Sequence, residues 1–178
     1  MKKNKSFLLT CLKDKPGKNI INHIVKYVGS DKKRFAELFK IFEETGGGVS
    51  NRAAWAMSYL VIETPSLIHP YFSKIIAMLC SPGHHAAIYR NILRFLKQIE
   101  IPEKYQGDVY DACLSFFMNA GNPIAVRSFS LYVLLRMSKL HPELKQELKI
   151  ILHEQKEFND SPAVKNVINK TIAAINKD

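Results

Sequence analysis

Apolar residues recur along this chain at spacings of three and four, which is the period of an α-helix rather than of a β-strand. In residues 35–42, for example, Phe35, Leu38 and Phe42 share one face, while lysine and glutamate lie opposite. The sequence contains no Asn-Gly hairpin turn and no sustained alternation of polar and apolar residues. The pattern therefore predicts an all-α protein.

Glycine and proline interrupt this pattern and divide it into a short first helix and nine further helices. We expect Gly46-Gly47-Gly48 to form a loop, after which Ser50 caps a helix running to about Glu63. Ser161-Pro162 is expected to open the last helix, because the first turn does not need the N–H that proline lacks. The predicted stripes cover about residues 7–12, 20–28, 35–42, 50–63, 68–79, 88–99, 109–117, 126–140, 144–152 and 164–175.

The helices also repeat. Apolar or aromatic residues stand two, seven and ten positions after each of four anchors, which are Arg52, Ala86, Arg127 and Lys165. These anchors are 34, 41 and 38 residues apart, a spacing typical of helical solenoids. One helix pair cannot bury its apolar face alone, whereas stacked pairs share a continuous core.

Ala125-Val126-Arg127 and Ala163-Val164-Lys165 resemble the start of the second helix in a HEAT repeat, although Asn51-Arg52 and His85-Ala86 depart from that pattern. The segments DKKRFAELFKIF and NRAAWAMSYLVI are similar to small uncharacterised bacterial HEAT-like proteins, a resemblance that brings no activity with it. The resemblance implies a single domain, residues 1–178, folded as a right-handed α-α superhelix (a HEAT-like solenoid) of about four helix pairs. The implied units are about residues 31–63, 65–99, 103–140 and 142–177, with residues 1–29 as an N-terminal helical cap.

Length and composition fit one globular domain, with 178 residues, 47% hydrophobic and 24% charged. The apolar stretch Phe7–Leu12 is too short for a signal peptide, and no run approaches a membrane span. The three cysteines are far apart, without a C-x-x-C motif, and read as reduced thiols. We therefore expect a cytoplasmic protein.

The searched catalytic motifs fail, because the sequence has neither a P-loop nor a G-x-S-x-G motif, and His153-Glu154 lacks the second histidine of a zinc protease. Cys80, His84 and His85 are close in sequence, but a helix break separates them, so we expect no metal site. The prediction is a non-enzymatic protein with no cofactor.

Charge is the unusual feature of the composition, with a formal net value of +10 that is concentrated in the N-terminal half. A basic surface attracts nucleic acid or acidic protein, and it also serves as an ordinary solvated surface. In HEAT-like solenoids the second helices line the concave side. The candidate binding residues on those helices are Arg52, Trp55, Tyr59, Tyr89, Arg90, Arg94, Lys97, Tyr132, Arg136 and Lys139.

Three functions remain open for this surface. We expect first an interaction or scaffold protein that binds a protein partner on its curved surface. The alternative is a nucleic-acid-binding protein with a basic concave groove, in which Trp55 stacks on a base instead of packing in the core. A glycosylase similar to the HEAT-like DNA-alkylation-repair enzymes ranks last, because those sites combine several aromatic residues with a nearby aspartate. Here Trp55 is the only tryptophan, and no aspartate accompanies it on a second helix.

Overall fold

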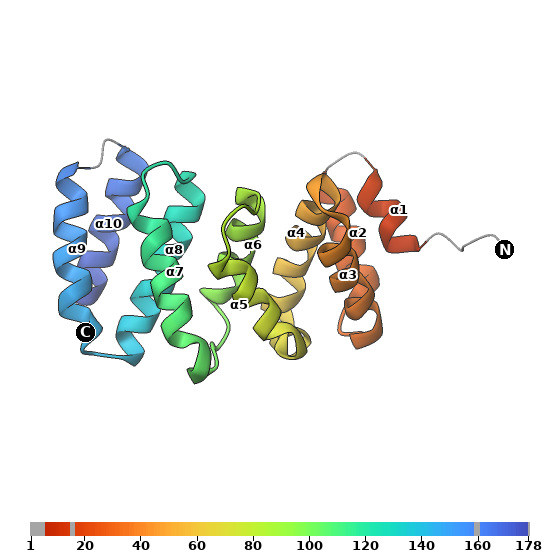
Figure 1. Ribbon diagram of the computed structural model, residues 1–178, viewed down its shortest axis with the longest axis horizontal. Coiled ribbons are helices and arrows are strands. Elements are labelled where there is room, and N and C mark those ends of the chain that lie inside the picture. Colours follow the sequence, from red (N-terminus) through yellow and green to blue (C-terminus); the bar gives the residue numbers. More distant parts are fainter. Residues whose placement is uncertain (1–5, 15–16, 159–160, 178) are drawn as a thin grey trace. The chain divides into compact units, whose positions relative to one another are not determined.

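The computed structural model describes residues 6–14, 17–158 and 161–177, and every regular element within these ranges is helical (Figure 1). They form ten α-helices and three short 3₁₀ helices. The predicted all-α class is confirmed. Residues 1–5 and 15–16 of the predicted cap lie outside the described residues.

By their internal contacts, the described residues form two compact units, one within Met1–Ile75 and Gly83–Ile99 and the other within Ile76–Pro82 and Glu100–Asp178. The boundaries predicted for the four repeat units stay predictions. We describe each compact unit by itself and call them unit 1 and unit 2.

Unit 1 is built around one long helix that touches four others. Its elements are α1 (Phe7–Lys13), α2 (Lys18–Val28), α3 (Lys32–Thr45), α4 (Gly47–Glu63), η1 (Pro65–Leu67), η2 (His69–Tyr71), the start of α5 (Phe72–Cys80), and α6 (Ala86–Leu96). Helix α4 contacts α1, α2, α3 and α6. Small residues such as Ala53 and Ala56 are fully buried in it, which lets its neighbours approach closely. Phe35, Phe39 and Phe42 of α3 fill much of this core.

Unit 2 repeats that arrangement around α8. Its elements are the end of α5, η3 (Glu103–Tyr105), α7 (Gln106–Met118), α8 (Ile124–Leu140), α9 (Leu144–Phe158) and α10 (Pro162–Ile175). Helix α8 contacts α7, α9 and α10, and α9 contacts α10 (Figure 1). Contact with three neighbouring helices explains why residues 124–140, which form α8, are apolar on nearly every side. Phe117, Leu134, Leu148 and Ile168 form the centre of the core.

The start of α4 differs from the prediction. The helix begins at Gly47 and not after a three-glycine loop, because Gly46, with φ of +64°, makes the turn that separates it from α3. Ser50 therefore lies inside the first turn, and its hydroxyl donates to the carbonyl of Phe42 at 2.8 Å. The predicted start of α10 is confirmed, because Ser161 is its N-cap and accepts from the N–H of Val164.

Candidate binding site on helices α4 and α6

Four of the predicted binding residues lie on half-buried edges of α4 and α6, which contact each other in unit 1, and a fifth, Lys97, follows directly after α6. Trp55 and Tyr59 are one turn apart on α4, and Arg90 and Arg94 are one turn apart on α6. The two edges meet where the guanidinium carbon of Arg94 lies 5.5 Å from the centre of the Tyr59 ring, a cation–π contact. We call Trp55, Tyr59, Arg90, Arg94 and Lys97 the basic face.

Arg90 has no compensating acidic group. It makes no ion pair or hydrogen bond within the described residues, and its Nε atom is buried without an acceptor. Arg90 as a whole is half-buried, so this Nε–H is a single unsatisfied donor, which carries a desolvation cost. An anionic group from outside the chain could pair with the guanidinium of this half-buried side chain.

Carboxylates are scarce on these two helices. The only acidic residue of α4 is Glu63, at its last position, and α6 contains none. Acidic residues instead lie on helices such as α3, which carries Glu37, Glu43 and Glu44. Glu63, which follows Trp55 and Tyr59 at four-residue spacing, is therefore the one carboxylate that these two helices place beside the basic face.

Arg52 is separate from this face because its side chain has a structural role. Its Nε–H donates to the carbonyl of Leu12 at 2.6 Å, in the last turn of α1. That carbonyl is one of the helix-end acceptors that lack a partner within their own helix. Gly48 leaves room for the guanidinium, since a Cβ at that position would come within 3.2 Å of an Arg52 Nη atom.

Tyr89 is also separate, because it points toward the interior. It is buried, and its hydroxyl accepts the backbone N–H of His84 at 3.2 Å. Consecutive residues of a helix point about 100° apart, so Tyr89 and its neighbour Arg90 face different surroundings. Lys97 follows directly after the last residue of α6, half-buried at the C-cap position.

The other three predicted residues lie on α8 in unit 2. Tyr132, Arg136 and Lys139 follow the same spacing as Arg90, Arg94 and Lys97, so they share one edge of their helix. Burial lowers the pKa of Arg136, and the nearby carboxylate of Glu100 opposes that effect. An arginine keeps its charge despite such a shift.

The described residues include neither a candidate metal site nor a candidate membrane-spanning helix. Among the described residues, no group of three or more His, Cys, Asp or Glu side chains could hold a metal ion. Within the same residues, no helix is long and apolar enough to cross a bilayer. All three cysteines are free thiols, with Cys113 buried and Cys80 exposed.

Sequence reasoning missed two features of unit 2. Arg127 is buried, and its Nε–H donates to the carbonyl of Phe117 at 2.9 Å, in the last turn of α7. Arg127 thus donates to a carbonyl at the end of α7, as Arg52 does at the end of α1. The second feature is a cavity between α7, α8 and the start of α9, whose polar residues come from η3, α7 and the connection from α8 to α9 and share no sequence motif.

Comparisons with known proteins agree with the helical architecture. A family model described as a HEAT repeat domain matches residues 8–175. Comparison with curated proteins and comparison with solved structures each gave no significant match.

Proposed function

The chain belongs to the HEAT repeat family, and from this we propose that it is a non-enzymatic interaction protein that binds an acidic segment of a protein partner. HEAT repeats typically mediate protein binding, and their stacked helices offer extended binding surfaces. The proposed site is the basic face of α4 and α6.

The observation that carries this proposal is Arg90, which has an unsatisfied Nε–H and no ion pair within the described residues, beside Arg94 and two aromatic side chains. Tryptophan, tyrosine and arginine are the residue types that contribute most to protein–protein affinity. A guanidinium binds a carboxylate through two parallel hydrogen bonds, a geometry that lysine cannot reproduce. The face therefore suits a partner with glutamate or aspartate beside an apolar residue that packs against Trp55.

Binding to nucleic acid is the second candidate, favoured by the net charge of +10. Arginine binds phosphate as readily as it binds carboxylate, and aromatic rings stack on bases. We rank it second because the family typically binds proteins. We also propose a cytoplasmic location, since free thiols such as Cys80 suit a reducing compartment.

Fluorescence anisotropy distinguishes the two candidates. The probes are a labelled peptide of alternating glutamate and leucine, a labelled DNA duplex and a labelled single strand, each titrated across a salt series. The test variant is Arg90→Gln with Arg94→Gln. The control is Lys18→Gln with Lys33→Gln, which removes the same charge at exposed positions of α2 and α3.

We expect the peptide to bind more tightly than either nucleic acid. The arginine variant should weaken this binding about tenfold, the effect of losing two partly exposed ion pairs, and the lysine variant should not. If DNA binds more tightly and the arginine variant reduces its salt slope by about two, nucleic acid replaces protein as the ligand. Equal effects of both variants would show that the basic face is not the site.

A further inference from the structure

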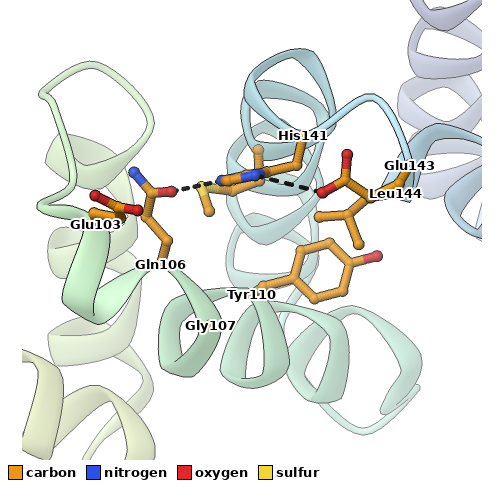
Figure 2. A pocket seen from close by; sticks show the side chains of 8 residues that line it. Glu103, Gln106, Gly107, Tyr110, His141, Glu143 and Leu144 are labelled. Atoms are coloured by element: carbon orange, nitrogen blue, oxygen red, sulfur yellow. Dashed lines mark hydrogen bonds and ion pairs between the residues drawn. The ribbon is translucent and has the colours of Figure 1, made fainter.

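The cavity in unit 2 has a volume of about 290 Å³ and combines an apolar interior with acidic groups. Leu144 of α9 and the ring of Tyr110 on α7 supply apolar surface (Figure 2). Met137 of α8 also lines the cavity. Glu103 and Glu143 also line it, and both are exposed to solvent. Pockets for drug-sized ligands occupy about 300–1,000 Å³, so this cavity suits one extended side chain or a small molecule.

A hydrogen-bonded chain fixes the proton of the histidine that lines this cavity. The Nε2 group of Gln106 donates to the carbonyl of Ile101 at 2.9 Å, which turns its Oε1 atom toward His141. That oxygen lies 2.6 Å from Nε2 of His141. Because an amide oxygen only accepts, Nε2 of His141 must carry the proton.

The other histidine nitrogen faces a carboxylate. Nδ1 of His141 lies 3.6 Å from Oε1 of Glu143 (Figure 2). In the neutral imidazole, with its proton on Nε2, Nδ1 is an acceptor, and so is the carboxylate. In that neutral form two acceptors face each other, and an ammonium group placed beside both atoms could donate to each. When the imidazole is protonated, its own Nδ1–H pairs with Glu143 instead.

A buried hydroxyl in the same wall also lacks a partner. Tyr110 is only 8% exposed, and its hydroxyl has no hydrogen-bond partner within the described residues. Figure 2 shows that its ring extends from α7 so that the hydroxyl lies on the side of Glu143 and Leu144. Burial, followed by the charges of Glu147 and Asp111, raises the pKa of this phenol, so it stays protonated.

We propose that this cavity binds an aliphatic ammonium, with the alkyl chain against Met137, Leu144 and the Tyr110 ring and the cation beside Nδ1 of His141 and the carboxylate of Glu143. Among the described residues, no lysine or arginine lines the cavity, although the chain as a whole is basic. A cation is therefore the ion that its lining favours. The same group occurs in a free alkyl diamine and in a lysine side chain of a partner. This site is independent of the basic face.

The test is a titration followed by the Met137 methyl signal in an NMR spectrum, at low salt. The probes are cadaverine and Nα-acetyl-lysine methylamide. Nα-acetyl-norleucine methylamide is the control ligand, because it keeps the alkyl chain and lacks the ammonium. The test variant is Glu103→Gln with Glu143→Gln, and the control variant is Glu154→Gln with Glu157→Gln on the exposed side of α9.

We expect an ammonium probe to shift the Met137 signal saturably and the norleucine derivative to leave it unchanged. The Glu103 and Glu143 variant should weaken binding about tenfold, and the control variant should not. Binding of cadaverine alone would identify a free amine as the ligand, whereas binding of the lysine derivative alone would identify a partner's side chain. Equal binding of norleucine, an effect below about twofold in the test variant, or no Met137 shift with either amine would overturn the proposal.

Discussion

Replacing Arg127 with methionine should destabilise unit 2, because the change removes the guanidinium and its hydrogen bond. Methionine still provides an unbranched, apolar side chain at that position. Arg127 is 4% exposed, and its Nε–H bonds the carbonyl of Phe117 at 2.9 Å. A hydrogen bond from a charged donor contributes about 1.5–3 kcal/mol. The guanidinium also stands near the C-terminal end of α7, where a cation is favoured.

An opposing effect reduces this loss. Burial lowers the pKa of Arg127, which reflects the cost of holding a cation away from water. Methionine removes that cost, and apolar replacements of buried ions are sometimes neutral for this reason. However, methionine leaves the Phe117 carbonyl without its donor, so we expect a net loss of about 1–2 kcal/mol. The melting temperature should fall by about 2–8 °C.

Urea unfolding followed by far-UV circular dichroism measures this change, and hydrogen exchange at the end of α7 locates it. Trp55 is the only tryptophan and lies in unit 1, so its fluorescence provides a probe outside the perturbed helix pair. Arg127→Lys serves as a matched variant that keeps the charge without the planar donor group. A methionine variant as stable as the original protein would refute the reasoning, because burial would then cancel the hydrogen bond.

Two further predictions concern the backbone and a thiol. Gly46→Ala should destabilise the protein by about 1–2 kcal/mol, because Gly46 has a φ of +64°. Gly107→Ala should stabilise it by about 0.5–1 kcal/mol, because Gly107 lies within α7 with open space around it, and thermal unfolding of both variants checks the opposite signs. Burial and the charges of Asp108 and Asp111 raise the pKa of the Cys80 thiol. Replacing both aspartates with asparagine should therefore lower that pKa and speed the alkylation of Cys80 by iodoacetamide near neutral pH. An unchanged alkylation rate, measured by mass spectrometry, would count against this electrostatic effect.

The sequence was sufficient for the helices because their apolar periodicity and Pro/Gly breaks are local signals. The Ser161-Pro162 start follows from the preferences of two adjacent residues, and the structure confirms it. The Ser50 start was wrong because the turn between α3 and α4 needs only Gly46, whose φ is positive, so the helix begins at Gly47 despite glycine's low helix propensity.

The candidate site was less predictable, because it depends on contacts between distant residues. Arg52 bonds a carbonyl 40 positions earlier, at Leu12, so no local pattern distinguishes it from Arg90. Tyr89 and Arg90 are neighbours in sequence, yet only the packing of α6 shows which of them is buried. The cavity around His141 likewise depends on Gln106, 35 residues away.

The most direct test of the binding proposal follows the indole N–H signal of Trp55 in an NMR titration with the glutamate–leucine peptide. Because Trp55 is the only tryptophan, this signal reports on the basic face without ambiguity. We predict a saturable shift in the original protein that is largely lost in the Arg90→Gln, Arg94→Gln variant. A peptide that binds and shifts other signals while the Trp55 signal stays fixed would contradict the assignment of the basic face as the binding site.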